Sequence, residues 1–154
     1  MKKYWILGLL VAFSANAQNL PPGYEALIKA ELPKTIEWRR FFHQNPELSN
    51  REYKTQQKIE SQLKTFGIET RTLAGTGVVG VLKGGKAGPV VALRADIDAL
   101  PVTERNNLSF KSVATTDYNG QKVGVMHACG HDSHIAMLLA TAEVLSKMKA
   151  ELPG

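Results

Sequence analysis

The chain is organised around one segment, Met126-His127-Ala128-Cys129-Gly130-His131-Asp132-Ser133-His134. It contains the only cysteine and three of the four histidines in the sequence. Thiolate and imidazole groups suit a divalent transition metal, and side chains two positions apart in an extended segment point the same way. We therefore predict Cys129 and His131 as metal ligands, with His127 in phase with both.

Each of these residues also has a competing interpretation. For His127 we favour a histidine that hydrogen-bonds behind the metal or inside the core over direct ligation. His134 lies one helical turn beyond His131, where packing or capping explains it better than metal binding does. A lone cysteine is most often a small buried hydrophobe, so a buried Cys129 is the alternative to a ligand.

The segments that precede this motif begin with two predicted helices. Apolar residues at three- and four-residue steps indicate a helix from Ile28 to Phe42, with Pro33 inside it and an end before Pro46. A second helix is expected from Arg51 to Phe66, where Gly67 can end it.

Short apolar runs then predict strands. Residues 68–73 alternate apolar and polar side chains, as a strand with one solvated face does. Residues 78–82 and 90–93 are β-branched runs on either side of a turn rich in glycine, which indicates a hairpin or neighbouring strands inside a sheet. A last helix, residues 134–148, would pack on that sheet. The predicted fold class is α/β, a mixed sheet flanked by helices.

Two acids, Asp96 and Asp98, follow the last of these strands, where open α/β sheets commonly carry active-site groups. Asp96 could orient a metal-bound histidine through its second ring nitrogen, while Asp98 would point elsewhere or join a loop network. The competing interpretation is a pair of carboxylates that are solvated or paired with Arg94. The polar stretch 103–122 is expected to be a surface loop over the site.

The first residues are typical of a signal peptide. Lys2 and Lys3 precede an apolar run from Trp5 to Phe13, and Ala15-Asn16-Ala17 is a cleavage pattern of small residues. The run is shorter than the roughly twenty residues that a membrane-spanning helix needs. We predict that residues 1–17 are removed and that residues 18–154 are exported, to a periplasm or out of the cell, with no membrane contact after cleavage.

The composition favours a globular protein of about one domain, with 154 residues, 44% of them hydrophobic and 21% charged. Cleavage would remove two lysines and take the formal net charge from +5 to +3. The sequence has no arginine-rich block and no basic patch interleaved with aromatic residues, so it does not predict nucleic-acid binding.

Three segments carry a family resemblance through their order and spacing: His43-Gln44-Asn45-Pro46-Glu47-Leu48-Ser49, Leu93-Arg94-Ala95-Asp96-Ile97-Asp98-Ala99-Leu100-Pro101 and Met126-His127-Ala128-Cys129-Gly130-His131-Asp132. Together they resemble the signatures of the M20 metallopeptidase family. The branch they resemble contains the amidohydrolases that act on N-acyl amino acids, hippurate and auxin conjugates.

The resemblance implies a zinc-peptidase-like (phosphorylase/hydrolase-like) catalytic domain, of which residues 18–154 would be the amino-terminal part. It implies that Cys129 and His131 hold one or two divalent ions, zinc or manganese, and that Asp96 is the acid beside them. Arg94 stands where related peptidases have a histidine ligand, which fits the amidohydrolase branch better than a dipeptidase. Members of the family often dimerise through a smaller lid domain, which we expect to lie outside these 154 residues.

The implied reaction is hydrolysis of the amide bond of a small N-acyl amino acid, as in aminoacylases and hippurate hydrolases. Metal-assisted hydrolysis also needs a base, and the only acids after the metal segment, Glu143 and Glu151, are better explained as solvated surface. We expect the base, a glutamate in that family, to lie outside these 154 residues, which alone would be inactive. The alternatives are a truncated metal-binding fragment and an interaction module that keeps only the fold.

Overall fold

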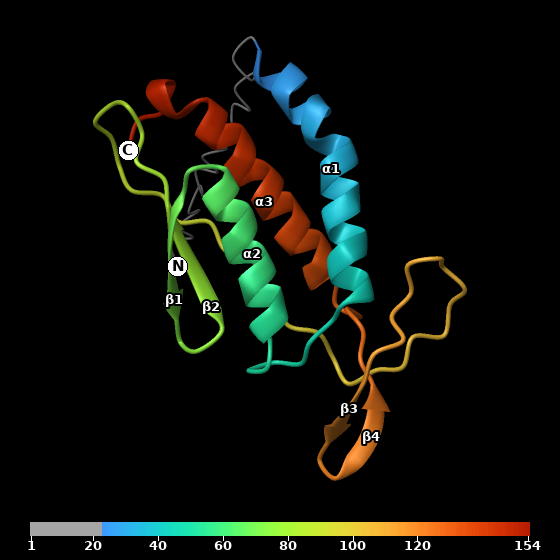
Figure 1. Ribbon diagram of the computed structural model, residues 1–154. Coiled ribbons are helices and arrows are strands. Elements are labelled where there is room, and N and C mark those ends of the chain that lie inside the picture. Colours follow the sequence, from blue (N-terminus) through green and yellow to red (C-terminus); the bar gives the residue numbers. More distant parts are fainter. Residues whose placement is uncertain (1–22) are drawn as a thin grey trace, which may run out of the picture.

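The computed structural model describes residues 23–154, so the predicted signal peptide, residues 1–17, lies outside the described residues. The chain forms three helices and two hairpins, and ends in a short 3-10 turn, η1 (Figure 1). The elements are α1 (Tyr24–Gln44), α2 (Tyr53–Thr65), β1 (Glu69–Leu73), β2 (Gly77–Val81), β3 (Thr115–Tyr118), β4 (Gln121–Gly124), α3 (His131–Lys147) and η1 (Lys149–Glu151).

The core lies where α3 packs against both α1 and α2, and the three helices run side by side in Figure 1. Trp38 and Phe42 of α1 meet Ile59 of α2 and the buried face of α3, which includes Ile135 and Leu139. These positions recur at three- and four-residue steps, so each helix presents one apolar stripe to the others. Burial of these stripes is the main favourable contribution to the folding free energy of the three packed helices.

Helices α1 and α3 are antiparallel, and charged pairs join both ends of their contact. Glu31, near the start of α1, pairs with Lys147 at the end of α3. At the other end His43, in the last turn of α1, contacts Asp132 in the first turn of α3. Together with Lys34, Lys147 also binds Glu143, which is therefore an ion-paired residue and not the solvated one that the sequence predicted.

The predicted helices are confirmed, and Pro33 lies within α1 without ending it. Proline lacks the N–H that would bond the carbonyl four residues earlier, at Lys29. Both residues are exposed, so water can satisfy that carbonyl. Helix α3 begins at His131, three residues earlier than predicted, and thus brings part of the metal segment onto the helix.

The strands form two separate antiparallel pairs, each with two strands. In the first, β1 pairs with β2 from Glu69 opposite Val81 to Leu73 opposite Gly77, and this hairpin packs on α2. The second, β3 with β4, lies mostly inside the stretch, residues 103–122, that the sequence predicted as a loop. Its turn residues Asn119 and Gly120 both have positive φ, of 50° and 76°, as the commonest tight hairpin turn requires.

The predicted interior strand at residues 90–93 is wrong for the described structure. These residues form no strand, and Val90 and Val91 are 96% and 76% exposed. A strand needs a neighbour to accept and donate its main-chain hydrogen bonds, and residues 90–93 pair with neither edge of the two-stranded β1–β2 sheet. No described strand lies against residues 90–93, so the fold is α/β with two small sheets and not one mixed sheet.

Within the described part of the chain, no helix is both long and apolar enough to cross a bilayer.

Two adjacent phenylalanines test the assignment of the core. Phe42 is completely buried, whereas Phe41 is 39% exposed. Phe42→Ala should lower the free energy of unfolding by about 3–5 kcal/mol, because it removes an aromatic ring and leaves a cavity. Phe41→Ala, the matched control, should cost about 1 kcal/mol or less, as a surface change does. Urea denaturation of both variants measures the difference, and equal losses would contradict the core as described.

Candidate metal centre

The candidate ligands lie in a loop between β4 and α3, which we call the metal loop and define as residues 126–131. Main-chain hydrogen bonds between Met126 and Leu100, of 3.0 and 3.1 Å, fix its start beside the segment that carries the two acids. Near the end of the loop, Gly130 has a φ of 83°, in the left-handed region that favours glycine. This tight turn puts His131 at the first position of α3.

His131 is held through one ring nitrogen and leaves the other available. Its Nδ1 lies 2.9 Å from the main-chain oxygen of Asp98 and 3.1 Å from a carboxylate oxygen of the same residue. Oxygen acceptors at Nδ1 place the proton there, so Nε2 keeps its lone pair for a metal ion. The side chain of His131 is largely buried, which restricts the ring to this orientation.

Asp96 faces the free nitrogen of His131, with its Oδ2 4.0 Å from Nε2. The contact at the second ring nitrogen, which the sequence analysis considered for Asp96, is made by Asp98. Asp96 also accepts two hydrogen bonds from Arg94, at 2.7 and 3.1 Å. These bonds and the charge of Arg94 lower the pKa of Asp96 below its ordinary value, so its carboxylate is ionised at neutral pH.

Cys129 is exposed, so the alternative of a small buried cysteine does not hold. Its thiol lies on the same loop as His131, and the pair supplies one soft and one borderline donor, a combination that suits zinc. Within residues 23–154, however, no group of three or more histidine, cysteine or acidic side chains is arranged to hold an ion. Cys129 and His131 could supply two of the ligands of a metal site, and their ligand role stays a prediction.

His127 is buried, and neither ring nitrogen has a hydrogen-bond partner among the described residues. The core histidine with a hydrogen bond, one of the interpretations of the sequence, is therefore absent from the described structure. Burial lowers the pKa of His127 to about 4, so the ring is neutral at pH 7. A buried imidazole with two free nitrogens is unusual and marks the inner side of the metal loop as polar.

His134 is exposed, and its ring centroid is 5.8 Å from that of His131. It lies on the same side of α3 as His131, as the spacing predicted. No hydrogen bond to its side chain is found in the described structure, so packing against the ring of His131 is its only role supported here.

Sequence reasoning gave His43 no role of its own, but the structure makes it the centre of a buried ionic network. Its ring lies between two carboxylates, with Nδ1 2.8 Å from Asp132 and Nε2 2.9 Å from Glu104. Asp132 follows the candidate ligand His131 directly in sequence. The signal that could have found this network is a histidine in the apolar stripe of α1, a position that requires polar partners when it is buried.

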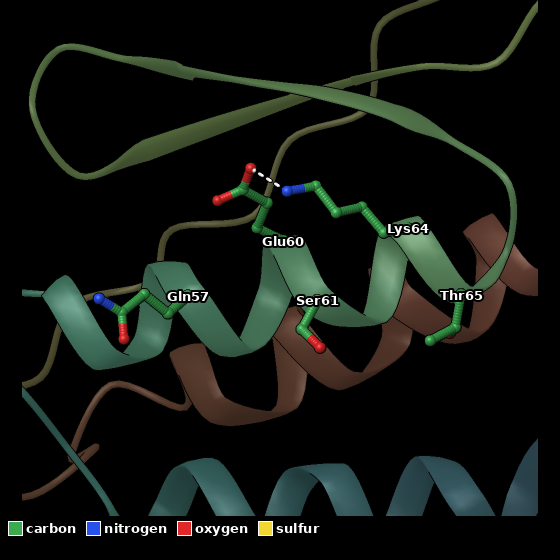
Figure 2. Close-up of a pocket in the computed structure, with 5 residues that line it drawn as sticks. All are labelled: Gln57, Glu60, Ser61, Lys64 and Thr65. Carbon is green, nitrogen blue, oxygen red and sulfur yellow. Dashed lines mark ion pairs between the residues drawn. The ribbon is translucent and has the colours of Figure 1, made fainter.

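A shallow, open pocket lies elsewhere, along α2 (Figure 2). All the residues that line it come from α2, namely Gln57, Glu60, Ser61, Lys64 and Thr65. Glu60 and Lys64 form an ion pair of 2.8 Å at the four-residue spacing common on exposed helices. None of the candidate ligands is near this hollow, and its chemistry suggests a solvated helix face.

A family comparison matches the carboxyl-terminal part of the chain. Residues 92–154, which contain Asp96, Cys129 and His131, match the model of Peptidase family M20/M25/M40. Residues 92–154 belong to the M20 family. The resemblance to this family is thereby confirmed, and the match contains the second and third of the three segments.

Named relatives agree with this membership. The chain is 48% identical to thermostable carboxypeptidase 2 of Saccharolobus solfataricus over 77% of its own length and 29% of that protein. It is 45% identical to the N-acyl-L-amino acid amidohydrolase of Geobacillus stearothermophilus, over 77% of this chain and 30% of that protein. The chain thus spans less than a third of the length of these relatives.

A solved structure confirms the fold. A Bacillus subtilis protein described as a dinuclear metal binding peptidase from the M20 family superposes with a TM-score of 0.72 at 44% identity. The match covers 82% of this chain and 34% of that protein. The α/β arrangement of this chain therefore corresponds to part of an M20 peptidase fold.

The buried His127 predicts a pH dependence of stability in metal-free protein. Its pKa of about 4 in the folded state lies below the value of about 6.5 in an unfolded chain. The unfolded state therefore binds the proton first as pH falls, and stability decreases from about pH 6.5 down to pH 4. The loss should reach about 3 kcal/mol by pH 4.

The control for this prediction is His127→Gln, which keeps a polar side chain but removes the titrating group. Urea denaturation with chelator present, at pH 7 and pH 4, gives the stability change of each protein. The wild-type protein should lose about 3 kcal/mol more than the variant, whereas parallel losses would contradict the neutral, buried state of His127.

Proposed function

We propose that this chain is the amino-terminal part of the catalytic domain of an exported, metal-dependent amidohydrolase. Its substrate would be an N-acyl amino acid, and its products a free amino acid and a carboxylic acid. The observation that carries the proposal is the geometry of His131, which is fixed through Nδ1 and has Nε2 free next to Asp96. The relative named N-acyl-L-amino acid amidohydrolase supports the substrate class.

Cys129 and His131 would hold the ion, the first through its thiolate and the second through Nε2. A bound divalent ion would polarise the amide carbonyl and lower the pKa of a bound water toward ~7. A thiolate ligand favours zinc over manganese, because manganese prefers oxygen donors. The related Bacillus subtilis protein is described as a dinuclear metal binding peptidase, which supports a metal-dependent activity for this chain.

The remaining residues of the site would orient these ligands. Asp98 keeps the proton of His131 on Nδ1 and the ring in place through two contacts. Asp96, whose pKa is lowered by Arg94, adds a negative charge 4.0 Å from Nε2. A carboxylate at this distance stabilises a cation bound between the two groups, so Asp96 would raise metal affinity.

A second candidate activity is carboxypeptidase action, favoured by the 48% identity to thermostable carboxypeptidase 2. Both reactions hydrolyse an amide next to a free carboxylate, and they differ in the group on the acyl side. Assays of the full-length protein with N-acetyl amino acids and with unblocked tripeptides separate them. Preference for the tripeptides would overturn the amidohydrolase assignment.

Export rests on the amino-terminal sequence and has its own test. If residues 1–17 are a signal peptide, the protein isolated from its source begins at Gln18. Intact mass and amino-terminal sequencing measure this directly. A mature protein that still begins at Met1 would rule out cleavage.

The ligand role of Cys129 predicts a spectroscopic change. In full-length protein loaded with Co²⁺, wild type should show the near-ultraviolet absorption of a thiolate bound to cobalt. Cys129→Ser should lose that band and bind Co²⁺ at least about 100-fold more weakly, since even residues that only orient ligands are worth 10–100-fold.

The matched control is His134→Ala, which alters an exposed side chain next to His131. It should keep the band and the affinity within about twofold, because no contact of His134 is needed for the proposed ligation. Loss of binding in His134→Ala together with an unchanged Cys129→Ser would contradict the proposed ligand set.

A further inference from the structure

A continuous series of buried hydrogen bonds connects the two ends of the metal loop without touching the candidate ligands. It starts at Val125, the residue before the loop, whose carbonyl accepts from the Ser112 hydroxyl at 2.6 Å. The main-chain N–H of Ser112 in turn donates to Glu104 at 2.5 Å. The start of the loop is thus tied to the segment that holds Glu104.

The series continues through His43 to the end of the loop. Glu104 uses its other oxygen to accept from Nε2 of His43 at 2.9 Å, and Nδ1 of His43 lies 2.8 Å from Oδ2 of Asp132. The same Oδ2 accepts from Arg39 at 3.3 Å, which identifies it as an acceptor. Nδ1 of His43 therefore donates, and Asp132 follows the last residue of the metal loop.

Because the groups that form these hydrogen bonds are buried and some are charged, the bonds hold the groups in one geometry. Ser112, Glu104, His43 and Asp132 are all buried. Burial by itself would raise the pKa of Glu104, but hydrogen bonds from His43, Ser112 and Asn106 lower it overall, so Glu104 is ionised. The ring of His43 thus lies between two buried carboxylates, those of Glu104 and Asp132. Charged hydrogen bonds in the interior are strong only at good geometry.

The opposite end of the α1–α3 contact shows that a series of buried hydrogen bonds is not needed simply to join these two helices. There Glu31 pairs with Lys147, whose side chain is 44% exposed, and neither residue contacts the metal loop. The series through His43 has an additional connection, from Glu104 to Ser112 and Val125, that adds nothing to the contact of the two helices. Its effect is to fix both ends of the loop relative to one another.

We propose that Ser112, Glu104, His43 and Asp132 form a brace that holds the metal loop in its ligand-binding conformation before a metal ion is bound. These four are positioning residues, because they act through the main chain of Val125 and through the first turn of α3. The inference rests on the proposed function, in which Cys129 and His131 are ligands. A preformed loop avoids the conformational entropy that ordering it on metal binding would cost.

Two variants break the brace at different places, and a third is the matched control. Ser112→Ala removes one hydroxyl and leaves all charged pairs intact, so it is the variant least able to prevent folding. His43→Leu removes the central ring. Glu31→Gln weakens the ion pair at the opposite end of the same two helices and reports the effect of a looser helix contact alone.

Two measurements on full-length protein are compared. The first is the dissociation constant for Co²⁺, followed by the thiolate absorption of Cys129. The second is hydrogen exchange in metal-free protein at the amides of Ser133 and His134, which bond to the carbonyl of Gly130 at 3.0 and 3.3 Å, relative to amides in the middle of α3.

Both brace variants should weaken Co²⁺ binding about tenfold, as loss of an orienting partner does, and should speed exchange at Ser133 and His134. Glu31→Gln should change neither by more than about twofold. The brace is overturned if Ser112→Ala binds Co²⁺ and exchanges like wild type, or if Glu31→Gln weakens binding as much as the brace variants do.

The experiment also separates this inference from the proposed function. If wild type binds Co²⁺ with the thiolate band and the brace variants match it, only the brace is wrong. If wild type shows no thiolate band, Cys129 is not a ligand, and the proposed function and the brace fall together.

Discussion

Asp132 is the point on which the arrangement of the described structure depends. Its buried carboxylate accepts from His43 and Arg39, both in α1, and so places the first turn of α3 against the last turns of α1. A buried carboxylate without such partners would be strongly destabilising. The contact therefore selects one antiparallel register of the two helices, and the apolar stripes around Phe42 and Ile135 pack in that register.

The candidate metal centre is a consequence of this register. Because α3 begins at His131 and its first turn is fixed, the ring of His131 points toward the segment that carries Asp96 and Asp98. The pairing of Met126 with Leu100 brings that segment to the same place from the other side. The segment that carries Asp96 and Asp98 and the metal loop, about thirty residues apart in sequence, thus meet at His131. The first supplies carboxylates and the second supplies the candidate ligands.

The polar groups of the site differ sharply in environment. Cys129 is exposed, so a metal ion can reach its thiol. Arg94 lowers the pKa of Asp96. His127 is buried and neutral, and its ring nitrogens have no partners among the described residues. A divalent cation at this position would meet neutral and negative donors on its open side, with the ring of His43 and its two carboxylate partners behind it. The negative charge of Asp96 beside Nε2 of His131 is therefore compatible with cation binding.

The sequence by itself determined the helices, the first strand pair in part, the family and the metal loop, because helical periodicity, glycine positions and closely spaced donors are local properties. It was wrong about residues 90–93, since an apolar run forms a strand only where a neighbour pairs with it. It also missed His43, whose role needs Glu104 and Asp132, residues far apart along the chain. Only the tertiary structure decided that Asp98 holds Nδ1 of His131, because two acids two residues apart are equivalent until the backbone orients them.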